Sequence, residues 1–320
     1  MSRVLLAVGD PNGIGPEIAV AAAAAAQEPP VLVGDRHVLA GHAAAAGVRL
    51  REHVPDVPPE AGVLDLVDVA ALPEDAFRPG TVSAEAGAAT VRYVSTAVAL
   101  ALGGGYRGIV ACPHSETAVH AAGIAFRGYP PLIAQLTGVP EDRVFLLLSG
   151  GGLDIVHATL HERLADGLAR LTPELVTAAG QALHGALRSF GVPQPRIGVM
   201  GVNPHASEGG LFGDDDERVT VPAVAALREL GVDAVGPTGS DVLLTTPGHD
   251  GFVAMYHDQG HVPVKLLAGR TATAMTVGAG VAFSSVGHGT AFDIAGRGVA
   301  DPAAVVRALA RFGRTKETTA

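Results

Sequence analysis

Cysteine, tryptophan and aromatic residues are scarce in this sequence. It has one cysteine, Cys112, no tryptophan, and 4% aromatic residues in a chain of 320. A single thiol excludes a disulfide framework and a zinc site built from cysteines. No apolar run approaches the roughly 18 residues of a membrane span without a glycine, a proline or a charge, and the opening MSRVLLAVGD lacks the regions of a signal peptide. We therefore expect a cytoplasmic protein with no membrane partner.

Positive charge is also in short supply. Lys and Arg total 22 against 32 Asp and Glu, which gives a net charge of −10. Without a basic face the chain cannot neutralise phosphates, so nucleic acid is excluded as a partner. The sequence is rich in apolar residues (48%) and in glycine (42 residues). The high apolar fraction, with only 17% charged residues, excludes disorder. The glycines fall in short clusters between apolar runs, which is typical of the loops of an α/β protein.

Short apolar runs alternate with alanine-rich stretches along the chain. We expect strands over residues 4–8, 31–33, 63–67, 108–112, 144–148, 153–157, 196–202, 252–256 and 271–276. We expect helices over residues 16–27, 37–46, 83–102, 162–190, 217–230 and 302–312, and Ser83 is expected to be the N-cap of the third. The alternation indicates βαβ units and a mostly parallel sheet, with a hairpin turn at 149–152. The length suggests two domains of about 150 residues each, and the lack of a linker indicates that they are interleaved.

Two glycine-rich segments are candidates for ligand binding. Residues 9–17, GDPNGIGPE, follow the first predicted strand, and their glycines would let backbone N–H groups approach a ligand. They do not match G-x-G-x-x-G, so an ordinary Rossmann fingerprint is absent, and a tight structural turn is the alternative. Residues 287–296, GHGTAFDIAG, carry His288 and Asp293 in a loop of small residues. The alternative there is a connection to the final helix.

Three histidines follow predicted strands. His157, His205 and His257 stand at three strand ends, where open α/β sheets place ligands. Three imidazoles could converge on one divalent metal and leave a position open for substrate. The i,i+4 pairs of His157 with His161 and of His257 with His261 are the alternative, since such a pair on one helix could chelate alone. Imidazoles suit Zn²⁺, while Mn²⁺, Co²⁺ and Mg²⁺ are possible when substrate oxygens complete the shell.

Lys265 is one of only two lysines, and it lies eight residues beyond His257. The chain otherwise uses arginine for its basic residues. Because lysine can lose its proton when buried and arginine cannot, this position is a candidate proton donor or compact charge. An ordinary surface lysine is the alternative.

Six segments in register resemble the 4-hydroxythreonine-4-phosphate dehydrogenase family, which acts in pyridoxal phosphate (pyridoxine) biosynthesis. They are GDPNGIGPEI (9–18), GTVSAEAG (80–87), PH-x-E (113–116), NPHASEGGLFG (203–213), MYHDQG (255–260) with Lys265, and HGTAFDIAG (288–296). The resemblance implies a homodimer of chains with two interleaved α/β/α domains of the isocitrate/isopropylmalate dehydrogenase-like type. The first domain would comprise 1–122 and 288–320 on the cofactor side, and the second 123–287 with the metal, substrate and dimer contacts. The active site would occupy the interdomain cleft.

The resemblance also implies roles for individual residues. The metal ligands would be His157, His205 and His257. Lys265 and Asp241 match catalytic positions, Asp241 being an acidic residue near the metal. The cofactor would be NAD, with NADP as the alternative, bound against Gly13, His288, Gly289, Thr290, Ala291 and Asp293.

Four departures from the family pattern fall on the substrate pocket. Tyr129 and Pro130 replace a His-Thr pair that contacts substrate in typical members. By ungapped counting, Ala274 replaces an asparagine and Phe283 an arginine. The loss of an arginine removes a charge-assisted contact to an anion worth about 1.5–3 kcal/mol. The substrate is therefore expected to be flatter and less charged than a phosphorylated amino acid.

These features together predict a divalent-metal- and NAD-dependent dehydrogenase. Its substrate would be a secondary alcohol of a small hydroxy acid or diol carboxylate, and decarboxylation would follow oxidation if a carboxylate lies β to the new ketone. Aromatic cis-dihydrodiol carboxylate dehydrogenases are relatives of the family with such substrates. The alternatives are a non-catalytic paralogue that binds metal or nucleotide, and a metal-dependent lyase.

Overall fold

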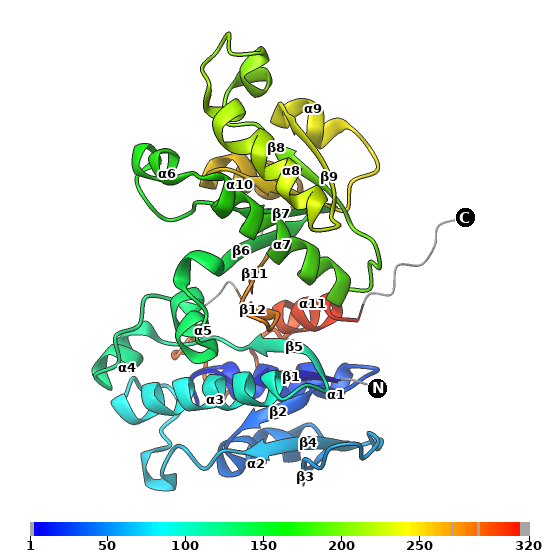
Figure 1. The fold of residues 1–320 in the computed structure, drawn as a ribbon. Coiled ribbons are helices and arrows are strands. Elements are labelled where there is room, and N and C mark those ends of the chain that lie inside the picture. The colour runs from blue at the N-terminus through cyan, green and yellow to red at the C-terminus, as the bar shows by residue number, and fades with distance from the viewer. Residues whose placement is uncertain (1–2, 270–271, 287–288, 314–320) are drawn as a thin grey trace. The chain divides into compact units, whose positions relative to one another are not determined.

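The computed structural model describes residues 3–269, 272–286 and 289–313, which divide into two compact units (Figure 1). Unit 1 comprises Met1–Thr137 and Phe283–Gly313, and unit 2 is built on Gly138–Ala282. The chain thus changes unit after residues 137 and 282, whereas the sequence predicted changes after 122 and 287. The first change comes later because α5 (Tyr129–Thr137) packs against α3 (Ala84–Leu102) of unit 1.

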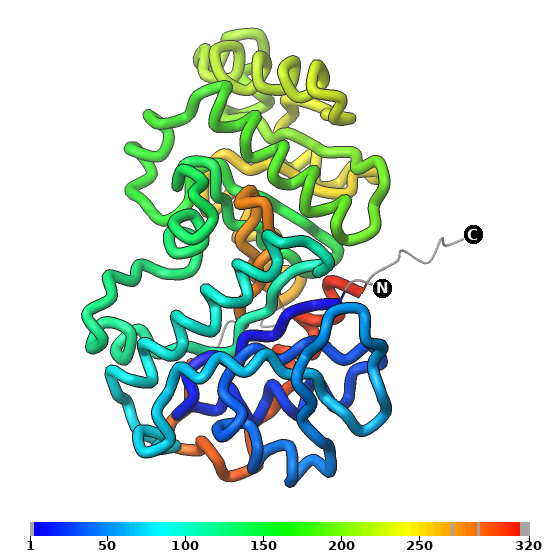
Figure 2. Tube along the Cα trace, turned by 60° about the horizontal axis from the view of Figure 1, so that its bottom comes forward, coloured from blue at the N-terminus to red at the C-terminus, as the bar shows by residue number. Residues whose placement is uncertain are grey.

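Unit 1 contains a parallel sheet in the order β3-β4-β2-β1-β5-β12. Its strands are β1 (Arg3–Ala7), β2 (Val31–Gly34), β3 (Arg49–Glu52), β4 (Val63–Asp68), β5 (Tyr106–Ala111) and β12 (Phe283–Ser285). The central strands β1 and β2 are apolar and almost wholly buried, as expected for a parallel sheet covered on both faces. The chain returns late to add β12 beside β5. Figure 2 shows the helix over residues 303–311 in red, and this helix packs against the blue helix over residues 15–25.

The helices of unit 1 form two groups. They are α1 (Gly15–Ala25), α2 (Arg36–Ala45), α3, α4 (Glu116–Ala121), α5 and α11 (Ala303–Arg311), with a 3₁₀ turn η1 (Glu74–Ala76). One group is α3 with α4 and α5, and α3 lies across β1, β2 and β5. The other is α1 with α2 and α11. The predicted N-cap of α3 is confirmed, because Ser83 Oγ accepts a hydrogen bond from the Ala86 N–H at 3.2 Å.

Unit 2 contains a mixed sheet in the order β11-β6-β7-β10-β8-β9. Its strands are β6 (Phe145–Gly150), β7 (Leu153–His157), β8 (Arg196–Met200), β9 (Asp233–Thr238), β10 (Gly251–Ala254) and β11 (Thr273–Val277). The predicted hairpin is confirmed, since β6 and β7 pair antiparallel. β7, β10, β8 and β9 are parallel, so their carboxyl ends meet at one edge of the sheet.

The helices of unit 2 differ from the prediction in three places, one of them the helix over residues 240–245, which the sequence did not predict. The helices are α6 (Leu164–Arg170), α7 (Pro173–Ser189), α8 (Val221–Glu229), α9 (Ser240–Thr245) and α10 (His257–Ala268), with 3₁₀ turns η2 (Glu141–Arg143) and η3 (Pro204–Glu208) and a π-helical turn η4 (Asp216–Thr220). The stretch 162–190, predicted as one helix, breaks because Thr172 caps α7 and Pro173 disfavours helix before it. The sequence did not predict α10, which contains Pro263.

The core beneath α9 and α10 fixes the edge of the sheet from which the site is built. Leu148, Ile155, Met200, Leu243, Phe252, Ala254 and Val264 form one buried apolar cluster. Leu243 comes from α9 and Val264 from α10, so both helices are held against the sheet by buried side chains. No helix in the described ranges is long and apolar enough to cross a membrane.

Candidate active site

Histidines gather in unit 2 where β7 ends and α10 begins. β10 pairs with β7 in parallel, with Ala254 opposite His157, so the two strands deliver their following residues to the same place. The ring centroids of His257 and His261 lie 3.8 Å apart, with planes inclined by only 13°. The ring of His157 lies 4.6 Å from that of His261, and the ring of His161 lies 5.5 Å from that of His257. The two i,i+4 pairs of histidines therefore form one cluster, in which His157 and His161 meet the two histidines of α10.

His157 is the buried member of this cluster, with 1% of its surface exposed. Burial lowers the pKa of its imidazole to about 3, so the ring is neutral. Its Nδ1 lies 3.2 Å from the carbonyl oxygen of Leu146, and its Nε2 lies 3.0 Å from Nδ1 of His261. Both ring nitrogens therefore have partners within the protein. Gly260 provides the space for this ring, because a Cβ there would collide with His157 Nε2.

His205 and His257 each pair one ring nitrogen with a carboxylate. Nδ1 of His257 lies 2.6 Å from Asp258 Oδ1, and Nδ1 of His205 lies 2.7 Å from Glu208 Oε2. A carboxylate at Nδ1 places the proton there and leaves Nε2 with a free lone pair, which is the arrangement of metal-binding histidines. The donor chemistry therefore fits a divalent metal.

The three predicted metal ligands are nevertheless not brought together. Among the residues that the structure describes, no three His, Cys, Asp or Glu side chains are arranged to hold a metal ion. The ring centroids of His157 and His257 lie 6.4 Å apart, and His205 stands on a separate loop, two-thirds exposed. Their role as ligands stays a prediction.

The loop that carries His205 is held in an unusual backbone conformation. Residues His205, Ala206, Ser207 and Glu208 all have positive φ, between 43° and 65°. Left-handed backbone costs roughly 1–2 kcal/mol for each non-glycine residue. The buried carboxylate of Asp216, on η4, accepts hydrogen bonds from the N–H groups of Val202 and Asn203 and from Ser207 Oγ. These bonds stabilise the turn and so fix where His205 projects.

Gln259 forms hydrogen bonds that connect three of the segments that carry predicted site residues. Its Nε2 donates to the carbonyl of Gly201 at 2.7 Å and to Ser240 Oγ at 2.9 Å. Its Oε1 accepts from the Met255 N–H at 2.6 Å. Because these partners precede His205, Asp241 and His257 by a few residues, the amide holds the loop after β8, the start of α9 and the start of α10 together.

Asp241 and Lys265 lie near the histidines. Asp241 is in the first turn of α9 and is exposed, and its charge helps raise the pKa of His205, after the larger effect of Glu208. Lys265 is exposed on α10, four residues beyond His261 and eight beyond His257. Residues at this spacing share one helix face, so α10 presents both imidazoles and the ammonium in one row.

In unit 1, the two glycine-rich loops contact each other. The Ile14 N–H donates to the carbonyl of Thr290 at 2.9 Å. A Cβ at Gly13 would lie 2.9 Å from Cβ of Thr290, so a glycine is needed for this approach. The sequence placed both residues at a cofactor site but did not predict that their loops touch.

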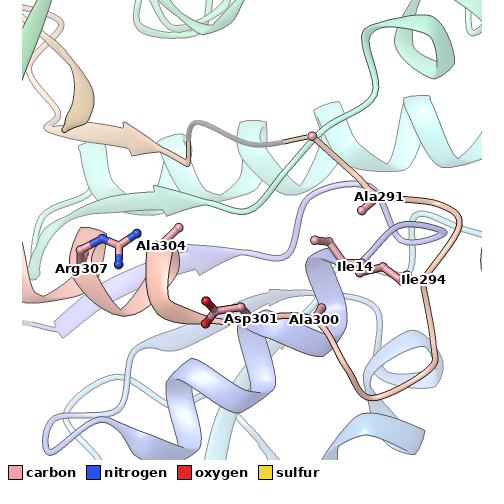
Figure 3. A pocket seen from close by; sticks show the side chains of 8 residues that line it. Ile14, Ala291, Ile294, Ala300, Asp301, Ala304 and Arg307 are labelled. Atoms are coloured by element: carbon pink, nitrogen blue, oxygen red, sulfur yellow. The ribbon is translucent and has the colours of Figure 1, made fainter. Parts of the chain in front are cut away.

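A pocket of about 520 Å³ lies beside these loops (Figure 3). Gly289 and Ala291, both predicted cofactor residues, line it together with Ile14, Asp301 and Arg307. Its volume lies in the range of about 300–1,000 Å³ typical of ligand sites. Asp293 is exposed in the following turn, and His288 lies outside the described residues.

Asp10 is a fully buried carboxyl group in the first loop. Burial raises its pKa to about 6, against the lowering effect of hydrogen bonds from the backbone of Asn12 and Gly13. Its Oδ2 has no hydrogen-bond partner in the described part of the chain. A buried carboxylate without full pairing is costly, so the protonated form is favoured here.

Two of the four predicted substrate-pocket residues meet in an aromatic cluster of unit 1. The ring of Tyr129 lies 4.7 Å from that of Phe283, 4.6 Å from His114 and 5.7 Å from Phe126. Pro130 follows in α5. Ala274 lies in β11 of unit 2, opposite Leu148. The pocket role of these four residues stays a prediction.

Residues 26–311 match the family model described as "Pyridoxal phosphate biosynthetic protein PdxA". The chain belongs to the PdxA family. This confirms the resemblance carried by the six motifs, and the match spans segments of both units.

Several PdxA-family relatives resemble the chain over nearly its whole length. It is 44% identical to a 1,2-dihydroxy-3,5-cyclohexadiene-1,4-dicarboxylate dehydrogenase of Comamonas sp., covering 97% of each chain. A crystal structure of a terephthalate 1,2-cis-dihydrodiol dehydrogenase from Burkholderia xenovorans LB400 is 53% identical, with a TM-score of 0.87 and 97% of each chain covered. A 4-hydroxythreonine-4-phosphate dehydrogenase structure from Burkholderia phymatum is 37% identical, with a TM-score of 0.88 and 98% of each covered. This PdxA-family chain is therefore a dehydrogenase, an oxidoreductase acting on CH–OH groups.

Several residues of the site were not predicted from the sequence, or were predicted only as alternatives. His161 and His261 were considered only as alternatives, although their spacing from His157 and His257 contained the signal. Gln259 and Asp216 had no signal, because a half-buried amide and a buried carboxylate act through partners distant in sequence.

Proposed function

We propose that this PdxA-family chain is an NAD- and divalent-metal-dependent dehydrogenase of an unphosphorylated cyclic cis-diol carboxylate. The contact between Tyr129 and Phe283 carries the proposal, because the family resemblance places polar contacts to a phosphorylated substrate at these positions. Both side chains are buried against each other, so neither offers a charged contact to a phosphate group. The two relatives named for dihydrodiol substrates support the same class.

His205 and His257 are proposed to hold the metal through Nε2. Each already has a carboxylate at Nδ1, which makes the ring a better donor. His161 suits the third position better than His157, because it is exposed and lies 5.5 Å from His257, whereas both nitrogens of His157 are occupied. When bound, the metal supplies Lewis acidity that eases loss of the hydroxyl proton. Zn²⁺ is the first candidate for three imidazoles, ahead of Mn²⁺, Co²⁺ and Mg²⁺.

The unit 1 pocket is proposed to hold the adenosine half of NAD. Ile14, Ala291 and neighbouring apolar groups offer a surface for a purine, Asp301 can accept from ribose hydroxyls, and Arg307 can pair with a phosphate. When bound, NAD would supply the hydride acceptor that oxidation of an alcohol to a ketone requires. A carboxylate beside the pocket disfavours the extra phosphate of NADP.

Lys265 and Asp241 are proposed to act on the substrate in unit 2. The exposed Lys265 ammonium, in the same row as His257 and His261, binds the substrate carboxylate. If that carboxylate lies β to the ketone and leaves as CO₂, the Lys265 Nζ–H returns a proton to the carbon. Asp241 keeps negative charge near His205, which favours a cation at that ring.

A homodimer is proposed because α10 presents apolar side chains outward. Val262, Leu266 and Leu267 are exposed by 50%, 80% and 63%. A second copy of the chain, packed on this face, would remove them from water.

The test is NADH formation measured by absorbance with metal-stripped protein reloaded with Zn²⁺, Mn²⁺, Co²⁺ or Mg²⁺. Turnover is expected with 1,2-dihydroxy-3,5-cyclohexadiene-1,4-dicarboxylate and not with 4-hydroxythreonine 4-phosphate. A larger kcat/KM for the phosphorylated substrate would overturn the substrate proposal. Full activity without metal would overturn the proposed metal dependence. Measuring CO₂ release in the same reaction decides whether decarboxylation follows.

A further inference from the structure

We propose that His157 is a positioning residue and not a metal ligand: through His261, it holds the ring of His257 in its metal-binding orientation. The inference rests on the proposed function, in which His257 is a ligand. It replaces the expectation from sequence that His157 coordinates the metal directly.

The hydrogen-bond contacts of His157 and His261 define which ring nitrogens carry hydrogens. The carbonyl oxygen of Leu146 can only accept, so Nδ1 of His157, 3.2 Å away, carries a hydrogen. A neutral His157 then has a lone pair on Nε2, which accepts from Nδ1–H of His261 at 3.0 Å. His261 is thereby fixed in the same tautomer.

The ring of His157 is held rigidly by its surroundings. It is almost wholly buried and is anchored to the backbone of β6 through Leu146. On its other side it lies against Gly260 of α10, where even a methyl group would collide with it. The ring thus couples a strand of the sheet to the first turns of α10.

His261 contacts His257 directly. The rings of His261 and His257 are stacked, with centroids 3.8 Å apart and planes 13° from parallel. Stacking restricts rotation of the His257 ring, and Asp258 holds its Nδ1 at 2.6 Å. His257 is therefore constrained on one face and at one nitrogen, which leaves Nε2 aimed in a fixed direction. Partners of this kind typically change metal affinity about 10- to 100-fold when removed.

The test compares two substitutions of His157 that differ in one property. His157→Gln keeps an acceptor for His261 Nδ1–H, whereas His157→Leu removes it. Zn²⁺ affinity, measured by chelator competition, is expected to fall about 10- to 100-fold in His157→Leu and less than about 5-fold in His157→Gln. The absorption spectrum of the Co²⁺-loaded protein is expected to keep its nitrogen ligation in both variants. Loss of one nitrogen ligand in both would show that His157 is itself a ligand and would overturn the proposal.

Glycine variants supply a matched control for packing. Gly260→Ala forces the His157 ring away and is expected to weaken Zn²⁺ binding like His157→Leu. Gly185→Ala, in α7 with no atom within 4 Å of the new methyl group, is expected to leave it unchanged. Equal effects of both would overturn the proposal.

Proton positions can be checked without metal. In the wild-type apo protein, ¹⁵N NMR of the imidazoles is expected to show hydrogens on Nδ1 of both His157 and His261. A hydrogen on Nε2 of His157 would overturn the proposed hydrogen bond from His261 to His157. A wild-type protein that shows this pattern but binds no metal would instead refute the metal site of the proposed function, so the two failures are distinguishable.

Discussion

The ring of Tyr129 lies against the ring of Phe283, with centroids 4.7 Å apart and planes inclined by 53°. Tyr129 begins α5 and Phe283 begins β12, so the contact joins two segments of unit 1 between which the chain builds unit 2. Phe283 is fully buried. The aromatic replacements therefore form a packed pair, and neither can be reversed without disturbing the other.

Phe283→Arg is expected to destabilise unit 1 and not to restore phosphate binding. The guanidinium would stand in the parallel sheet beside Ile109, at a fully buried position packed against the ring of Tyr129. An unpaired buried charge costs about 3–5 kcal/mol of unfolding free energy. Urea denaturation measures the loss, and Phe283→Leu is the control, with about 1.5 kcal/mol or less expected. A stable Phe283→Arg protein that binds phosphorylated hydroxy acids would mean that this position opens onto the substrate.

Asp216→Asn is expected to loosen the left-handed turn that carries His205. One carboxylate oxygen accepts from the Val202 N–H and Thr220 Oγ1, and the other accepts from Asn203 and Ser207. An amide NH₂ in place of either oxygen faces donors, so the unfolding free energy should fall by about 2–3 kcal/mol. Metal affinity should fall as well, because the loop no longer fixes His205.

The neighbouring Asp215→Asn provides the control for this prediction. Asp215 is half exposed and accepts from Asn203 Nδ2 and Arg218. A change within about 0.5 kcal/mol is expected there. If thermal melting and Zn²⁺ affinity respond equally to both substitutions, Asp216 does not organise the turn.

The sequence predicted the elements that depend on local pattern and missed those that depend on distant partners. The N-cap Ser83 and the β6–β7 hairpin are local features, and both are confirmed. The helix α10 begins with His-Asp-Gln-Gly and contains Pro263, residues with weak helix preference, and it is held by burial of Val264 against the sheet. The histidine cluster was predicted only in part: the i,i+4 spacing singles out the two pairs, but their meeting follows from the parallel pairing of β7 with β10, which spacing does not reveal.

Asp10 is expected to make stability decrease as pH rises. Its folded-state pKa of about 6 lies above the ordinary value of 3.8, so between these values the folded protein binds more protons than the unfolded chain. The unfolding free energy therefore falls as pH rises through this window, by about 3 kcal/mol at most. Asp10→Asn removes this contribution. Urea titrations of both proteins from pH 4 to pH 7 should show that the unfolding free energy of the variant, relative to that of the wild type, rises with pH. Parallel curves would contradict the prediction.

Leu266→Asp is expected to convert the proposed homodimer into monomers. Leu266 is 80% exposed on α10, beside Leu267 and Val262, and a charge there would be buried without a partner when two copies pack together. Sedimentation velocity should show the wild type as a dimer and the variant with at least about a 100-fold larger dissociation constant, since about 3 kcal/mol of lost interface energy corresponds to that factor. Leu102→Asp, at a half-exposed position at the end of α3 in unit 1, is the matched control and should remain dimeric. A dimeric Leu266→Asp protein with unchanged affinity would place the interface elsewhere, whereas a monomeric wild type would refute the dimer itself.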